Sequence, residues 1–237
     1  MQRNLILFSG GKDGMYAPER MVEQEGANLV VSITSKNGDT QFHAGPEANQ
    51  LFREAQLRAL NFETVMLEIG SNPNYLNELY EGLKSLVKTK DVQQLVTGDL
   101  WHPYTNGIGD ILSGALNIPI LRPARDACPS LVNGKNYALE LIRRGIKFLI
   151  VSIRKGNLSK DFVGRQFDEG LVNELEKRGI DPAGESGEYQ TIVIFSKLMN
   201  RKLVIDDFNV NLVNGKNGKE KFHRMNIMGF HDEDANR

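Results

Sequence analysis

The chain alternates between short apolar runs and longer segments in which apolar residues recur every three or four positions. The apolar runs predict strands buried in a parallel sheet, at residues 5–8, 27–33, 64–69, 95–98 and 118–121. The helical spacing predicts helices between them, at residues 16–25, 46–60, 75–87 and 106–116. This repeated order indicates an α/β fold, in which a Rossmann-like open parallel sheet carries helices on both faces.

The pattern changes after residue 121. Prolines and weak periodicity over residues 122–134 indicate a boundary, so we expect a nucleotide-binding domain at 1–125 and a smaller α/β domain at 126–237. In the second part we expect helices at 137–144 and 171–178 and strands at 147–153 and 191–195. The glycine-rich segment 214–218 predicts a C-terminal hairpin, followed by an acidic tail, 232–234, that we expect to be solvated and disordered.

The first predicted strand passes directly into small residues, a lysine and a carboxylate, Ser9-Gly10-Gly11-Lys12-Asp13-Gly14. Glycines let the backbone turn tightly around a ligand, and the next helix directs its positive N-terminus to the same place. This arrangement indicates a phosphate site. It is not a Walker loop, because Ile6 and Asp13 stand where that loop needs glycine and Ser/Thr, and it lacks the Gly-x-Gly of dinucleotide-binding proteins.

Polar residues also follow two other predicted strands, as Thr34-Ser35 and Gly98-Asp99. In open parallel sheets, ligands bind at the carboxyl ends of the strands, where the strand order reverses. We therefore expect these residues to form one nucleotide site with the loop after the first strand. Trp101 is either a stacking surface for adenine or a packed cover over the sheet.

Composition limits the other functional classes. The 237 residues are 40% hydrophobic and 25% charged, with a net charge of −1, so nothing indicates a nucleic-acid partner. The apolar runs are too short to cross a bilayer and the N-terminus lacks a signal segment, so we expect a cytoplasmic protein without a membrane partner. The single cysteine, Cys128, excludes an intrachain disulfide; we expect an inert thiol, with a nucleophile as the alternative.

A second polar cluster lies late in the chain, Gly184-Glu185-Ser186-Gly187-Glu188-Tyr189-Gln190-Thr191. Its carboxylates and hydroxyls can bind Mg²⁺, an amine or a polar substrate group. The alternative is a turn with solvated acids.

These two clusters together resemble a known family. Residues 9–13 are similar to the pyrophosphate loop, Ser-Gly-Gly-x-Asp-Ser, of N-type ATP pyrophosphatases, which split ATP between its α and β phosphates; Gly14 replaces the last serine. Combined with Gly-Glu-x-Gly-Glu-Tyr-x-Thr, the pattern resembles the diphthine–ammonia ligase family, of the adenine nucleotide alpha hydrolase type. The resemblance extends from Leu5 to about Val204.

The resemblance implies a HUP-type nucleotide domain and a smaller domain that closes the substrate cleft. It implies an ATP-dependent amide ligase that activates a carboxylate as an acyl-adenylate, releases pyrophosphate and aminates the adenylate with ammonia. The family motifs place Ser9, Gly10, Gly11, Lys12, Asp13 and Gly14 on the ATP loop, and Gly184, Glu185, Gly187, Glu188 and Thr191 on the substrate loop.

The chemistry of these side chains agrees with that division. We expect Lys12 to stabilise charge on the departing pyrophosphate and Asp13 to help hold Mg²⁺. Either Glu185 or Glu188 is expected to orient ammonium or accept its proton.

The chain departs from the family after the fourth predicted strand, where a Ser/Asp/Tyr-rich motif is replaced by Gly98-Asp99-Leu100-Trp101-His102-Pro103-Tyr104. We expect Asp99 and Trp101 to contact the acyl substrate, either diphthine on elongation factor 2 or a small molecule. Two other functions stay open: an adenylating RNA-modification enzyme, and a non-catalytic adenine-nucleotide sensor, which Gly14 permits. The oligomeric state is also open, with a homodimer as one option.

Overall fold

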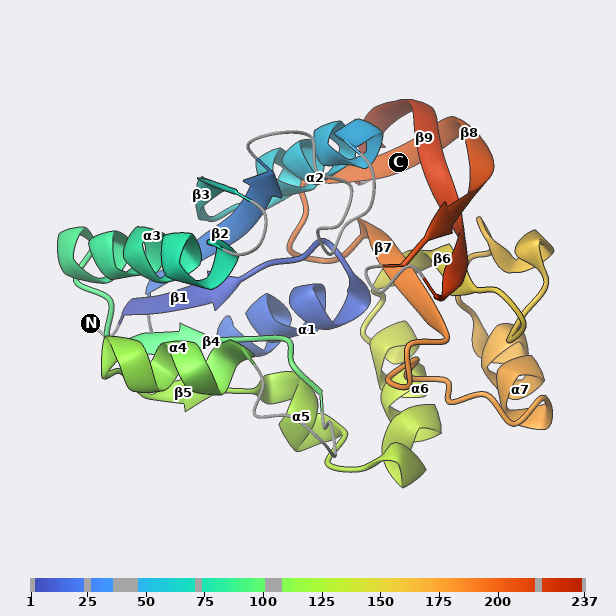
Figure 1. Cartoon of the computed structure of the whole chain (residues 1–237), viewed down its shortest axis with the longest axis horizontal. Coiled ribbons are helices and arrows are strands. Elements are labelled where there is room, and N and C mark those ends of the chain that lie inside the picture. Colours follow the sequence, from blue (N-terminus) through green and yellow to red (C-terminus); the bar gives the residue numbers. More distant parts are fainter. Residues whose placement is uncertain are drawn as a thin grey trace.

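The computed structural model describes residues 3–23, 27–35, 47–70, 74–100, 108–215 and 219–235, which form two sheets surrounded by helices (Figure 1). The first half alternates strands and helices, as predicted. Its elements are β1 (Arg3–Leu7), α1 (Lys12–Met21), β2 (Ala27–Ser35), α2 (Glu47–Ala59), β3 (Glu63–Ile69), α3 (Tyr75–Thr89), β4 (Gln94–Val96), α4 (Ile108–Leu116) and β5 (Ile120–Leu121). The second half contains α5 (Pro123–Ala127), η1 (Leu131–Asn133), α6 (Gly134–Arg143), β6 (Lys147–Arg154), η2 (Lys160–Phe162), α7 (Glu169–Lys177), β7 (Tyr189–Phe195), β8 (Arg201–Asn214) and β9 (Lys221–Asp234).

The first sheet is parallel throughout, in the order β3-β2-β1-β4-β5. The chain runs outward from β1 to β3 and then returns to β4 on the other side of β1, so the strand order reverses between β1 and β4. Right-handed crossovers then place helices on opposite faces of the sheet. Leu5 accordingly packs in a cluster with Leu79 and Leu83 of α3, while Ile6 packs with Ala17 of α1. The predicted open α/β sheet with helices on both faces is confirmed.

The second sheet is antiparallel, in the order β7-β6-β9-β8, and confirms a smaller C-terminal α/β unit. The predicted C-terminal hairpin is β8–β9; residues 216–218 of its expected turn lie outside the described residues. The prediction of a disordered tail at 232–234 was wrong. These residues belong to β9, where Asp232 pairs with Leu203 and Glu233 forms an ion pair of 3.1 Å with Lys202.

The two halves share a hydrophobic cluster. Phe8, Tyr16 and Phe52 of the first half belong to the same cluster as Phe148 and Tyr189 of the second. Figure 1 shows α2 extending from the parallel sheet to the β8–β9 hairpin.

A buried asparagine on α2 continues this contact. Asn49 Nδ2 donates to the carbonyl of Met225 at 3.1 Å, and the amide of Ile227 donates to Asn49 Oδ1 at 3.0 Å. The side chain thus satisfies two backbone groups of β9, because an amide offers a donor and an acceptor. The first-half helix α2 is therefore part of the packing of the second sheet.

Two details differ from the sequence predictions. Helix α1 begins at Lys12 and not at Tyr16, so Pro18 lies in the helix interior instead of the first turn. Pro18 has no amide hydrogen for the carbonyl of Gly14, and the helix continues with one hydrogen bond fewer. The expected boundary segment contains α5, which starts at Pro123 because proline is well suited to the first helical position. The division at residues 125 and 126 falls inside this helix and stays a prediction.

Candidate functional site

The loop between β1 and α1 has a backbone conformation at Gly10 that favours glycine. Gly10 has φ +81°, in the left-handed region, and a Cβ atom there would lie 2.5 Å from Gln56 Oε1. Gly11 is extended and precedes the first residue of α1. The predicted turn into a helix N-terminus is confirmed, at the carboxyl end of the central strand β1 and beside the strand-order reversal, where ligands bind in such sheets.

Backbone atoms of this loop are held from elsewhere in the chain. The Gly10 carbonyl accepts from the amide of Val193 in β7 and from Gln56 Nε2 in α2, both at 2.9 Å. The amide of Lys12 donates to Thr191 Oγ1 at 3.2 Å. Thr191, expected on the substrate loop, therefore contacts the ATP loop directly.

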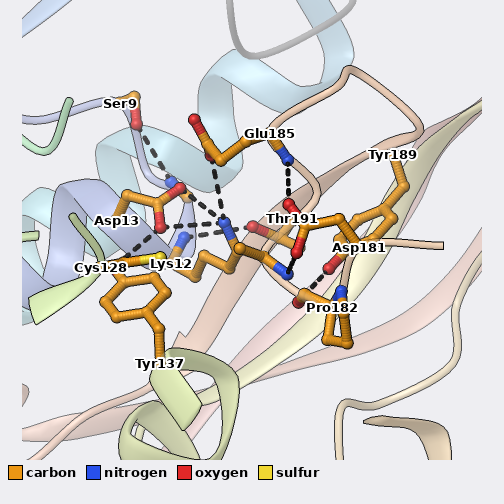
Figure 2. Close-up of polar contacts among 12 residues, drawn as sticks. Ser9, Lys12, Asp13, Cys128, Tyr137, Asp181, Pro182, Glu185, Tyr189 and Thr191 are labelled. Atoms are coloured by element: carbon orange, nitrogen blue, oxygen red, sulfur yellow. Dashed lines mark hydrogen bonds and ion pairs between the residues drawn. The ribbon is translucent and has the colours of Figure 1, made fainter. Parts of the chain in front are cut away.

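Lys12 is enclosed by carboxylates from both halves of the chain, as Figure 2 shows. Its ammonium lies 2.7 Å from Asp13 Oδ2 and 4.0 Å from Glu185 Oε1, and the residue is only 4% exposed. Burial alone lowers the pKa of Lys12, but the charges of Asp13, Glu185 and Asp181 outweigh it and raise the pKa above 10.5. Lys12 thus keeps its positive charge although its own side chain is buried.

Glu185 lies on a loop that Asp181 organises. Asp181 Oδ1 accepts from the amide of Ala183 at 2.9 Å, and Asp181 Oδ2 accepts from the amide of Glu185 at 3.3 Å. Burial, followed by the negative charges of Asp13 and Asp181 and opposed by Lys12, raises the pKa of Glu185 to about 8. Glu185 can therefore gain or lose a proton near neutral pH.

Glu188, the second acid of this loop, has different surroundings. It is 8% exposed, and its Oε2 atom has no hydrogen-bond partner among the described residues. Burial raises its pKa, and nearby Asp181 adds to the effect. Of the two glutamates, Glu185 is the one that approaches Lys12.

Glycines of the two predicted motifs, together with Gly98 after β4, permit close packing around the site. A Cβ at Gly14 would lie 2.8 Å from Ser9 Oγ, and one at Gly98 would lie 2.5 Å from the carbonyl of Asp13. Gly184 and Gly187 have φ of +74° and +76°, which side chains rarely adopt. The serine expected at position 14 would thus collide with Ser9, so Gly14 fits this loop as it stands.

The structure describes the side chains of only some of the remaining predicted site residues. Thr34 and Ser35 are the last residues of β2 and do not follow it, since their backbones still pair with β3; their side chains lie outside the described structure. Asp99 accepts from Thr97 Oγ1 at 3.0 Å, and its charge contributes to the raised pKa of Glu185. Trp101 lies in 101–107, outside the described residues.

Three residues that matter here were not predicted as site residues. The hydroxyl of Tyr137 on α6 donates to Asp13 Oδ1 at 2.9 Å, Gln56 connects α2 to the loop, and Asp181 holds the Glu185 loop. Asp181 carries a local signal, because aspartate four residues before a Glu-containing glycine-rich turn is typical of side chain–backbone turns. Tyr137 and Gln56 carry none, since their partners are distant in the sequence.

The structure also bears on the single thiol and on metal binding. Cys128 is buried, and burial together with Asp181 and Glu185 raises its pKa to about 11, as befits the inert thiol that we predicted. Within the described ranges, no group of three or more histidine, cysteine, aspartate or glutamate side chains is arranged to hold a metal ion.

The strand order and the glycine-rich loop at its reversal point define an open, Rossmann-like α/β protein. Comparison with protein families narrows this class. The diphthamide synthase N-terminal domain matches residues 2–110, and the diphthamide synthase C-terminal domain matches residues 133–226. The chain belongs to the diphthamide synthase family, which confirms the resemblance found in the sequence.

Curated relatives agree with this assignment. The diphthine–ammonia ligase of Mus musculus is 23% identical over 227 residues, covering 86% of this chain and 83% of the relative. The diphthine–ammonia ligase of Homo sapiens is 23% identical over 231 residues, covering 88% and 84%.

Solved structures show weaker similarity. A predicted subunit of tRNA methyltransferase from Methanocaldococcus jannaschii is 16% identical, with a TM-score of 0.41, and the match covers 83% of this chain and 98% of that one. A 4-thiouridine synthetase in complex with RNA and ATP is 11% identical, with a TM-score of 0.44, and covers 82% and 55%. In the described part of the chain, no helix has the length and apolarity needed to span a membrane.

Proposed function

We propose that this protein is an ATP-dependent carboxylate–ammonia ligase of the diphthine–ammonia ligase type. The observation that carries the proposal is that the two predicted loops, far apart in sequence, meet in one site. Lys12 Nζ lies 4.0 Å from Glu185 Oε1, and the amide of Lys12 is bonded to Thr191 Oγ1. Residues for ATP cleavage and for the incoming amine are thus side by side, as a two-step ligase requires.

In the first step, the substrate carboxylate attacks the α-phosphate of ATP, forming an acyl-adenylate and releasing pyrophosphate. The glycine-rich turn and the N-terminus of α1 suit the phosphates. Lys12 retains its charge and can pass from Asp13 to the leaving pyrophosphate.

The site also suits Mg²⁺, which commonly takes only one or two protein carboxylates beside substrate phosphates and water. Asp13, already paired with a cation in Lys12, is the carboxylate that would hold it. The ion would neutralise phosphate charge during cleavage.

In the second step, ammonia attacks the acyl carbon, the bond to AMP breaks, and the nitrogen loses a proton. In its ionised form Glu185 is suited to accept that proton, because a pKa of about 8 allows this carboxylate to ionise near neutral pH and it borders the ATP loop. Glu188 is buried in the same loop and is the alternative acceptor.

The family relationship favours diphthine on elongation factor 2 as the carboxylate substrate, with a small-molecule acid as the alternative. The RNA-modifying alternative gains no support from Cys128, whose buried thiol has a raised pKa. We further propose that the segments 1–125 and 126–237 supply the nucleotide and acceptor halves of the reaction, respectively.

The test is to incubate the full chain with α-labelled ATP, Mg²⁺, ammonium and diphthine-bearing elongation factor 2, and to measure AMP, pyrophosphate and amide. We expect equal amounts of AMP and amide. Small-molecule acids and RNA are tested in parallel as acceptors.

Variants separate the two steps. Glu185→Gln should still release pyrophosphate in a single turnover but form amide more slowly, whereas Glu81→Gln on the surface of α3 should resemble the wild type. ADP and orthophosphate as products would contradict the proposed cleavage. ATP binding without turnover of any acceptor would favour the nucleotide sensor.

A further inference from the structure

Tyr137 connects the second half of the chain to the ATP loop. It lies on α6, is 1% exposed, and its hydroxyl donates to Asp13 Oδ1 at 2.9 Å (Figure 2). Among the described residues, the side chains that donate to Asp13 are Tyr137 and Lys12. The orientation of this carboxylate therefore depends on one residue from each half.

The two contacts restrain the carboxylate in different ways. Lys12 Nζ approaches both oxygens of Asp13, at 2.9 and 2.7 Å, and as a point charge it does not distinguish between them. The Tyr137 ring is fixed by burial, so its hydroxyl has a defined position and selects one oxygen of Asp13. Among the residues that the structure describes, Oδ2 then accepts from Lys12 alone.

We propose that Tyr137 is a positioning residue for ATP cleavage, which it promotes by fixing the Asp13 carboxylate and, through it, the Lys12 ammonium. This inference rests on the proposed function. Catalytic groups must be held within a fraction of an ångström of their working positions, and surrounding hydrogen bonds supply that restraint. In this role α6 supports the ATP loop through the hydrogen bond from Tyr137 to Asp13.

The neighbouring Tyr16 provides a control that distinguishes this positioning role from a contribution to packing alone. Tyr16 is also buried, and its ring meets the Tyr137 ring edge-on, with centroids 5.3 Å apart. The hydroxyl of Tyr16 interacts with Arg144 and not with the ATP loop. Tyr16→Phe is therefore a matched control, because it removes a hydroxyl from the same aromatic pair.

The experiment is a double-mutant cycle with Tyr137→Phe and Asp13→Ala in the full chain, because alanine leaves no acceptor for the Tyr137 hydroxyl. Pyrophosphate release in a single turnover, the dissociation constant of ATP and the melting temperature are measured for each variant. If Tyr137 acts through Asp13, Tyr137→Phe should slow release by about tenfold in the wild type but by less than about twofold beside Asp13→Ala. The dissociation constant should change by less than about threefold, and Tyr16→Phe should lose less than about threefold in rate.

If Tyr137→Phe slows pyrophosphate release equally with and without the Asp13 substitution, Tyr137 does not act through Asp13. If Tyr137→Phe does not slow release in the wild type, the Tyr137 hydroxyl does not contribute to ATP cleavage. Unfolding of Tyr137→Phe where Tyr16→Phe remains folded would assign the hydroxyl to stability. Each of these results overturns the inference. Failure of the wild-type chain to make AMP would instead overturn the proposed function, so the two failures are distinguishable.

Discussion

Replacing Glu185 with glutamine should stabilise the ligand-free protein at neutral and alkaline pH, although it should slow amide formation. In the unfolded chain this carboxyl ionises near its ordinary pKa of 4.5, whereas in the folded protein it keeps its proton until about pH 8. The folded state thus binds more protons between these values, and the stability of the wild type falls as the pH rises through them. Glutamine does not titrate and avoids this loss.

The size of the effect follows from the two pKa values. Each pH unit between them costs about 1.4 kcal/mol of folding free energy, or about 3 kcal/mol in total by pH 7. Glu185 keeps 23% of its side-chain exposure, and its charge also interacts with Lys12, so the net gain is smaller. We expect Glu185→Gln to be more stable by about 1–3 kcal/mol at pH 8 and equal to the wild type at pH 4.5.

The assay is urea unfolding of both proteins between pH 4.5 and 9, without nucleotide, with melting temperatures as a second measure. A gain of 1 kcal/mol corresponds to about 2–4 °C for a chain of this size. Glu81→Gln, which changes an exposed acid on α3, is the control and should show no pH-dependent gain.

A stability difference that is the same at pH 4.5 and pH 8 would refute the reasoning, because it could not come from ionisation of Glu185. A wild-type protein that is the more stable of the two at pH 8 would also refute it. In that case Glu185 would be ionised and held by Lys12 in the ligand-free state.

Three other substitutions test separate parts of the structure. Lys12→Ala should slow ATP cleavage by about a hundredfold or more while changing ATP affinity much less, measured by single-turnover kinetics and calorimetry. Gly10→Ala should destabilise the protein by at least about 1 kcal/mol in urea unfolding, because φ is +81° and the new methyl group meets Gln56; Gly114→Ala, in open space on α4, should not. Asn49→Leu should cost about 2–4 kcal/mol in the same assay, because two buried backbone groups of β9 lose their partners.

For each of these three predictions, one result would contradict the structural reasoning. Turnover of Lys12→Ala within about threefold of the wild type would remove Lys12 from the chemistry. Equal stabilities of the Gly10 and Gly114 variants would mean that the loop can relax. An unchanged unfolding curve for Asn49→Leu would mean that water replaces the lost hydrogen bonds.

The strands and helices were predictable because their apolar periodicity is local. The stripe of Leu79 and Leu83 identifies α3, and the run around Ile6 identifies β1. The start of α1 was missed because its first turn, Lys12 to Gly14, is polar and small, as suits a loop built for a ligand. The acidic tail was missed because its partners, including Lys202, lie on the opposite strand of the hairpin.

The part of the candidate site that could be predicted consists of residues that are contiguous in the sequence. The ATP loop and the Glu185 loop are such stretches, although their contact at Lys12 depends on the fold. Tyr137 looked like the first residue of an ordinary amphipathic helix, and Gln56 like a polar residue within another. Their roles come from partners on other elements, which no local pattern reveals.

The hydrogen bonds from β7 to the ATP loop have a consequence for synthesis of the chain. The loop leaves the ribosome first, but Thr191 and Val193, which bond to Lys12 and Gly10, are made some 180 residues later. A nascent or truncated chain that ends before β7 therefore lacks the atoms that fix this loop. Premature termination or proteolytic loss of the second sheet should therefore leave fragments in which this loop is less ordered than in the full chain.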